Sequence, residues 1–169
     1  MTQRVTVPTT APTIPSNTPA GSGDLKDYSW HDAKTKLRAA GLHPTRQRIA
    51  LGQILFAKGD RHVTAEILYA EANHAKVPVS LATVYNTLNQ FTNVGLLRQI
   101  VVEGSKTYFD TNSSEHPHFY VEDQHELVDV PTSDVLGEAP VPPEGYEIVR
   151  VDVVIRLRRK AEQAAANGC

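Results

Sequence analysis

The sequence contains a single cysteine, Cys169, which is the last of its 169 residues. One cysteine excludes an internal disulfide and a thiolate zinc site of the CxxC type, and it is typical of a cytoplasmic protein. Long apolar runs are missing as well, so neither a signal peptide nor a membrane-spanning helix is predicted. We therefore expect a cytoplasmic protein without membrane contacts.

The first 24 residues lack the material for a hydrophobic core. Four prolines occur there among threonines and small residues, without an apolar run. Such a composition is typical of a disordered tail. We predict a disordered segment at 1–24 and a flexible tail at 161–169, which leaves residues 25–160 for folded structure.

Charge is unevenly distributed, although the whole chain carries a formal charge of only −2. Residues 26–109 hold 11 Lys and Arg against 6 Asp and Glu, whereas residues 110–169 hold 5 against 12. The first part is therefore basic and the second acidic, and a basic surface attracts the phosphates of nucleic acid. Six cations of the basic part are candidate phosphate contacts: Arg46, Arg48, Lys58, Arg61, Arg98 and Lys106.

The segment from Ser80 to Phe91 is the most informative one, because it predicts a helix with two different faces. An apolar stripe at helical spacing indicates a buried face. The other face carries small and hydrogen-bonding side chains of the kind that read base edges in a DNA groove. These candidate DNA-reading residues are Ala82, Thr83, Tyr85, Asn86 and Asn89. An ordinary amphipathic helix would show the same pattern, so the neighbouring segments matter.

Three more helices are predicted before this one, capped by Ser29, Thr45 and Thr64. The first is expected to turn Trp30 inward together with three smaller apolar residues and to end at Gly41.

Two β-rich runs follow the helix, at 97–102 and 106–110, with a turn between them. Helices followed by a hairpin are the order of a winged helix-turn-helix, which reads the major groove with its last helix. We therefore predict a winged-helix DNA-binding domain at 25–109.

Residues 110–160 have a β-rich pattern. Apolar and mixed positions alternate from Glu147 to Arg158, which predicts one strand with an apolar face. Two shorter strands are predicted at 119–121 and 126–130. A sheet of this size buries too little apolar surface to be stable alone. We therefore expect the protein to dimerise through it. A two-fold dimer would also present two reading helices to a palindromic site.

Histidines and carboxylates supply the candidate chemistry of the second half. His116 and His118 leave an extended segment on the same face, and Pro117 between them favours that extended backbone. Together with neighbouring acids and one upstream histidine they form a ligand set suited to iron, manganese or zinc. The candidate ligands are His62, Asp110, His116, His118 and Asp129. A surface histidine pair without any ligand is the alternative.

Several motifs resemble the ferric uptake regulator family of bacterial repressors. They are GLHPTRQR at 41–48, HVTAEILY at 62–69, LATVYNTL at 81–88 and the segment around His116. The resemblance covers about residues 28–160. It implies an α+β protein, in which a winged-helix domain precedes a small α/β dimerisation and sensing domain at 110–160. It also implies a homodimer, or a higher oligomer, on double-stranded operator DNA, with a regulatory metal held by the five candidate ligands.

Within the family, the chain is most similar to the iron response regulators of α-proteobacteria, through runs such as 110–112, 118–120 and 143–147. That branch implies a regulator of iron and haem homeostasis that binds DNA when iron and haem are scarce. Haem, held by His116 and His118 and delivered by a haem-supplying protein, would release the regulator from DNA or lead to its loss. Two features depart from the branch: its histidine triplet reads His116-Pro117-His118 here, and its Cys-Pro haem motif is absent.

Two other functions stay open. A repressor that depends on iron, manganese or zinc is the first, including the peroxide-sensing type, which also combines three histidines with two aspartates. Val121 and Gln124 stand where the first cysteine pair of a four-cysteine structural zinc site would lie, so no such zinc is expected. A metal hydrolase with Glu66 or Glu115 as general base is the second, and it is disfavoured because no nucleophile–base pair is apparent. We therefore expect no enzymatic activity.

Overall fold

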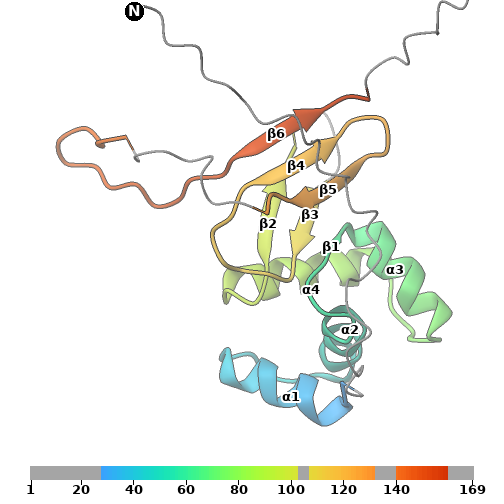
Figure 1. Ribbon diagram of the computed structural model, residues 1–169. Coiled ribbons are helices and arrows are strands. Elements are labelled where there is room, and N and C mark those ends of the chain that lie inside the picture. The colour runs from blue at the N-terminus through green and yellow to red at the C-terminus, as the bar shows by residue number, and fades with distance from the viewer. Residues whose placement is uncertain (1–27, 103–106, 132–139, 160–169) are drawn as a thin grey trace, which may run out of the picture.

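The computed structural model describes residues 28–102, 107–131 and 140–159, and Figure 1 shows four helices followed by two small sheets. Helix α1 lies at one end of the molecule and strand β6 at the other. This is an α+β arrangement, as predicted. The predicted tails at 1–24 and 161–169 and the candidate phosphate contact Lys106 lie outside the described residues.

The four helices begin where the sequence places their caps. They are α1 (Trp30–Ala39), α2 (Arg46–Phe56), α3 (Ala65–His74) and α4 (Leu81–Asn93). The side-chain oxygens of Ser29, Thr45, Thr64 and Ser80 each accept a backbone N–H from the first turn, which has no partner within the helix. Among the described residues, no helix has the length and apolar character needed to cross a membrane.

The inner faces of the helices meet in one hydrophobic core. Val84, Leu88 and Phe91 of α4 are fully buried there, so the predicted apolar stripe is confirmed. Trp30 was predicted to face inward, and this was wrong, because 43% of its surface is exposed. Side chains of a helix tilt toward its N-terminus, so the first residue of α1 points past the end of the core.

The first sheet forms the wing and also includes a short strand from between the helices. Strands β1 (His62–Val63), β2 (Arg98–Val101) and β3 (Thr107–Asp110) are antiparallel, in the order β1-β3-β2. Their register places His62, Asp110 and Arg98 in one row across the sheet.

The second sheet contains β4 (His118–Val121), β5 (Glu126–Asp129) and β6 (Val154–Leu157), in the order β5-β4-β6. β5 runs antiparallel to β4 and β6 parallel to it, and the register places Asp129 beside His118. A small apolar cluster from β2 to β5 joins the two sheets: Ile100, Val102, Tyr108, Tyr120 and Leu127. This packing fixes the ends of the strands relative to one another.

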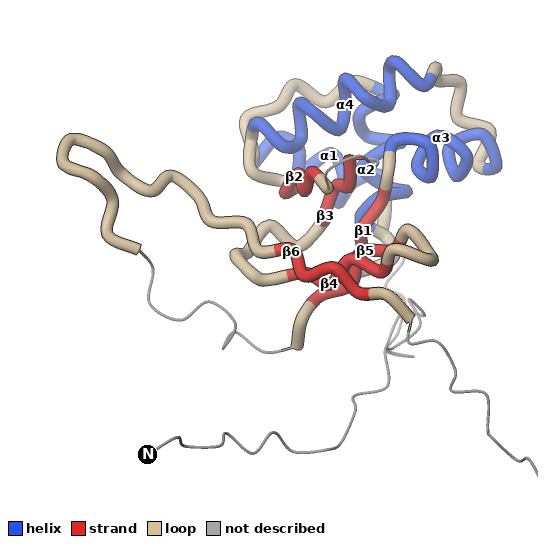
Figure 2. The backbone as a smooth tube through the Cα atoms, turned by 90° about the horizontal axis from the view of Figure 1, so that it is seen from above, coloured by secondary structure: helices blue, strands red, loops and turns tan. Residues whose placement is uncertain are grey.

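The strand predicted from Glu147 to Arg158 forms only over its last part, from Val154 to Leu157. Residues 140–149 form a long projecting loop, which Figures 1 and 2 show from two directions, and residues 150–153 return to the wing and the second sheet. Ile148 is 42% and Val149 87% exposed. Alternation indicates a segment that suits a sheet, but a strand also needs a neighbour to pair with, and the described part of this chain provides one only for β6.

Candidate metal centre

The five candidate ligands lie together where the two sheets meet. His62 comes from β1 and Asp110 from the end of β3, while His118 begins β4 and Asp129 ends β5. His116 lies in the loop between β3 and β4. One ligand atom from each of these side chains lies within 4.8 Å of all the others. The centre thus draws on both sheets and on the loop that joins them.

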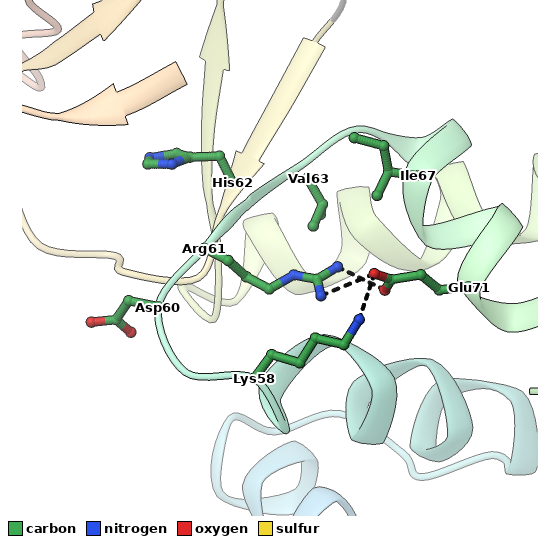
Figure 3. Close-up of a pocket in the computed structure, with 7 residues that line it drawn as sticks. All are labelled: Lys58, Asp60, Arg61, His62, Val63, Ile67 and Glu71. Atoms are coloured by element: carbon green, nitrogen blue, oxygen red, sulfur yellow. Dashed lines mark hydrogen bonds and ion pairs between the residues drawn. The ribbon is translucent and has the colours of Figure 1, made fainter. Parts of the chain in front are cut away.

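Consecutive side chains at the start of β1 point in opposite directions. His62 points toward the second sheet, whereas Arg61 points away from it, to Glu71 of α3 (Figure 3). The backbone N–H of Arg61 donates to Oγ1 of Thr111, and the N–H of Thr111 donates to the carbonyl of Arg61. These bonds hold the residue before His62 against the residue after Asp110.

The Nε2 atoms of the three histidines converge on the same two carboxylate oxygens. Oδ1 of Asp129 lies 3.0 Å from Nε2 of His62 and of His116, and 3.6 Å from that of His118. Oδ2 of Asp110 lies 3.1 Å from His116, 3.3 Å from His118 and 3.6 Å from His62. Ligand atoms about 2.1 Å from one ion lie about 3.0 Å apart at 90° and about 3.6 Å apart at 120°. The separations therefore fit one shared ion.

The buried nitrogen of His62 also fits an ion ligand. Its Nε2 makes no hydrogen bond, although Oδ1 of Asp129 is only 3.0 Å away. Buried polar atoms in proteins almost always have a partner, so an exception needs an explanation. Imidazole nitrogen and carboxylate oxygen together suit ferrous iron, manganese or zinc. A metal ion among these five atoms would provide the missing partner.

A proton on His62 offsets the negative charges of the two carboxylates at the centre. Burial lowers the pKa of His62, but Asp110 and Asp129 outweigh this effect and raise it to about 9. Burial raises the pKa of Asp110, but the neighbouring imidazoles of His118 and His62 outweigh it and hold this pKa well below its usual range. The pKa of Asp129 is lowered in the same way, with His62 opposing the effect of burial. A divalent cation at the centre would take over the role of the proton on His62.

The predicted reading face of α4 is accessible. Ala82, Tyr85, Asn86 and Asn89 are exposed, whereas Thr83 is half-buried. The hydroxyl of Tyr85 donates to Oε1 of Glu66 on α3 at 2.8 Å. This bond and the nearby carboxylate raise the pKa of Tyr85. The ring of Tyr85 is thus held on the outer surface of α4.

The candidate phosphate contacts have different environments. Arg46 is exposed in the first turn of α2. Arg48 donates from Nε to Gln90 of α4 at 2.8 Å and from Nη1 to the carbonyl of His43 at 2.7 Å. Lys58 and Arg61 both form ion pairs with Glu71 at 2.7 Å, in the hollow drawn in Figure 3. Among these candidates, Arg46 thus presents an exposed cation at the N-terminal end of α2.

Arg98 was predicted to contact phosphate, and this was wrong. Its side chain is only 6% exposed and forms an ion pair with Asp152 at 2.7 Å. The sequence did carry a signal for this burial: Arg98 has the same parity along the wing strand as the buried Ile100 and Val102. A charged residue at an inward position of a strand indicates a partner of opposite charge, which here is Asp152.

A winged-helix domain with an exposed polar helix, joined to a second sheet through a cluster of histidines and aspartates, defines a DNA-binding protein regulated by a small ligand. The sequence model of the ferric uptake regulator family matches residues 39–156, and the chain belongs to this family. The family consists of metal-responsive, DNA-binding transcriptional regulators that form dimers.

Two related sequences and one solved structure show how similar the chain is to other members. The ferric uptake regulation protein of Pseudomonas aeruginosa is 31% identical over 129 residues, which cover 75% of this chain and 96% of that protein. The structure of the ferric uptake regulator from the same species with manganese has a TM-score of 0.62 and 30% identity, covering 76% of this chain and 98% of that one. The peroxide-responsive repressor PerR of Staphylococcus epidermidis is 33% identical over 104 residues, 61% of this chain and 68% of that protein. These neighbours confirm the predicted fold class.

Proposed function

We propose that the chain is a regulator of iron homeostasis that binds operator DNA as a dimer and is switched by a ligand at the five-residue centre. The observation that carries the proposal is the convergence of three Nε2 atoms and two carboxylate oxygens within 4.8 Å, between the wing sheet and the second sheet. The two sheets contribute different ligands, so an occupant touches both.

The location of the centre suggests how occupancy would act on DNA binding. An ion held by His62 and Asp110 of the wing sheet and by His118 and Asp129 of the second sheet fixes the angle between the two parts. In a dimer, that angle sets the distance between two reading helices. The ion changes DNA affinity only as far as it binds one arrangement better than the other.

A divalent ion is the occupant that we favour, with ferrous iron or manganese ahead of zinc. Three imidazoles and two carboxylates combine borderline and hard ligands, which these ions accept. The side chains of Asp110 and His118 are 1% and 2% exposed, so a large ligand could not contact them in this arrangement, whereas a single ion has the size of the gap between the ligand atoms. A structural zinc site with four cysteines is not available, since the sequence has one cysteine.

Haem is the second candidate, and it is supported by the similarity of the sequence to the iron response regulators. His116, whose side chain is 14% exposed, lies nearer the surface than His118. Haem bound through both histidines would require residues 111–118 to move away from Asp110. In this variant of the proposal, haem, received from a haem-supplying protein, lowers operator affinity. The similarity to PerR also supports a peroxide-sensing variant, in which the bound ion is iron.

The proposed DNA surface is the outer face of α4 with the N-terminal turn of α2. Ala82, Thr83, Tyr85, Asn86 and Asn89 would read bases, and Arg46, Arg48 and Lys106 would contact phosphates. The proposed dimer surface includes the projecting loop at 140–149, in which the apolar side chains of Val141, Tyr146, Ile148 and Val149 are exposed in a single chain.

Operator binding measured with and without each ligand tests the proposal. Fluorescence anisotropy would be recorded for the metal-free protein and after addition of ferrous iron, manganese, zinc or haem. We expect an ion to change operator affinity in the wild type and to lose this effect in a His62→Ala, His118→Ala double variant. Arg158→Gln, at a side chain 80% exposed, is the matched control.

Haem and ion are separated by the same assay. If haem alone changes operator affinity, and a His116→Ala, His118→Ala double variant abolishes the response, the haem variant of the proposal holds. If neither an ion nor haem changes the affinity of the wild type, the proposed switch is wrong.

A further inference from the structure

Arg98 is a buried cation that joins three segments of the chain. From β2 its Nη1 donates to the carbonyl of Ser114 at 2.8 Å, and its Nη2 donates to the carbonyl of Val151 at 3.0 Å. Nη2 and Nε also donate to Oδ1 of Asp152, at 2.7 and 3.2 Å. A guanidinium presents its donors in a fixed planar fork, so these bonds define the position of both neighbouring segments.

The carbonyl of Ser114 is shared between Arg98 and a candidate metal ligand. Nδ1 of His116 lies 2.9 Å from this oxygen. A carbonyl oxygen only accepts hydrogen bonds, so Nδ1 carries the proton and Nε2 is the atom that faces the centre. Hydrogen bonds of this kind on the second ring nitrogen orient the imidazole of metal-binding histidines. The chain of contacts therefore runs from Arg98 through the Ser114 carbonyl to His116.

The register of the wing sheet places Arg98 next to the centre on its other side. Arg98 is directly opposite Asp110, which is in turn opposite His62. His62 and Asp110 contact residues of the second sheet at the candidate metal centre. Arg98 instead bonds to residues 151 and 152, which come just before β6 of that sheet. The two sheets are thus joined at two places along one row, and only one of these places involves the candidate ligands.

We propose that Arg98 is a positioning residue for the centre: it holds the loop at 111–116 so that His116 presents Nε2 to the ion, and it links this loop to the wing without metal. This proposal rests on the ion-binding function proposed above. Lysine cannot replace arginine here, because a single ammonium group cannot reach the carbonyls of Ser114 and Val151 and the carboxylate of Asp152 in the same plane.

Metal affinity of the full-length protein tests the proposal, measured for manganese and zinc by competition with a chelator. We expect Arg98→Lys and Arg98→Gln to weaken binding about 10- to 100-fold, the usual cost of losing an outer contact of a metal ligand. Arg150→Gln is the matched control, because Arg150 also pairs with Asp152 but does not contact Ser114. We expect this control to bind metal like the wild type. Equal affinity in wild type and both Arg98 variants would overturn the proposal.

Two further measurements separate positioning from a general loss of stability. In the zinc-loaded protein, the Nδ1 proton of His116 should exchange slowly with solvent in the wild type and in Arg150→Gln, and quickly in Arg98→Lys. Amide exchange of residues 111–116 in the metal-free protein should rise in the Arg98 variants more than exchange in α1 to α4. Equal protection of that loop in the wild type and in Arg98→Lys would contradict the proposal.

The same set of variants distinguishes failure of this proposal from failure of the proposed function. If the wild type binds no ion, or if His118→Ala binds as well as the wild type, the ion-binding function fails. Amide exchange in the metal-free protein then still decides whether Arg98 holds the loop. If Arg98→Gln does not fold, Arg98→Lys, which keeps the charge, provides the test.

Discussion

His62 and Asp110 stand directly opposite each other on β1 and β3, with 3.6 Å between Nε2 and Oδ2. A strand of two residues thereby carries a histidine from between two helices to the end of the wing. This pairing puts a ligand of the helical domain beside ligands of the second sheet. It also makes the protonation of His62 sensitive to whatever occupies the centre.

Metal binding is expected to release a proton near neutral pH. The pKa of His62 is raised to about 9, so this imidazole is protonated in the metal-free protein and must lose its proton before Nε2 can bind an ion. Apparent affinity should therefore rise with pH up to about 9. Titration calorimetry in two buffers with different ionisation enthalpies would measure the released proton. Identical heats in both buffers would contradict the prediction.

Stability of the metal-free protein should depend on pH in a defined direction. The pKa of His62 is higher in the folded protein, about 9, than the ordinary value of about 6.5 for a histidine. Its stabilisation is therefore complete below about pH 6.5 and is lost as the pH rises to about 9. Urea unfolding in the presence of a chelator should show a decreasing free energy of unfolding over this range. We expect His62→Gln to flatten the curve, and an unchanged curve would assign the effect to another group.

Base reading by α4 predicts a selective loss of affinity. Tyr85→Ala and Asn86→Ala should each cost about 1–3 kcal/mol in binding to the operator, which is the size of a good base contact. Binding to random DNA should change little, because it depends on phosphate contacts. The carboxylate of Glu66 accepts a hydrogen bond from the Tyr85 hydroxyl, so Glu66→Gln tests whether this bond positions Tyr85 for base reading. Wild-type operator affinity in both alanine variants would exclude this face as the reader.

Phosphate binding by the first turn of α2 predicts a change in salt dependence. Arg46→Ala should weaken operator and random DNA alike and reduce the slope of log affinity against log salt by about 1. Arg158→Ala, in the acidic half, should leave the slope unchanged. Anisotropy titrations over a series of salt concentrations would give both slopes. The same slope in wild type and Arg46→Ala would place the phosphate contact elsewhere.

Dimerisation through the projecting loop predicts that a charge at Val149 is disruptive. This side chain is 87% exposed in a single chain, and burying aspartate in an apolar interface without a partner is costly. Val149→Asp should sediment as a monomer, or dimerise more weakly than the wild type. Val101→Asp, at another exposed valine, on the wing, is the control that should remain dimeric. Dimers of equal strength in both variants would place the interface outside this loop.

Local signals predicted the helical part of the fold well. Hydrogen bonds between a cap and the first turn involve residues three positions apart, so Ser29, Thr45 and Thr64 could be identified without tertiary structure. The strand at 147–158 was predicted too long for the opposite reason. The alternation of apolar residues is a local property of the sequence. Whether the segment forms a strand also depends on a neighbouring strand, which a distant part of the chain or a second chain must provide.

The sequence by itself determined which residue types are available: three histidines and two aspartates suited to one ion, a polar helix face for DNA, and a single cysteine that excludes a four-cysteine zinc site. Tertiary structure alone decided which of them meet. His62 lies 48 positions before Asp110 in the chain, and only the pairing of β1 with β3 places them in one row. Arg98 belongs to the same row and lies in the interior instead of facing DNA. Its charge can be read from the sequence, but the partner that allows this charge to be buried, Asp152, is known only from the tertiary structure.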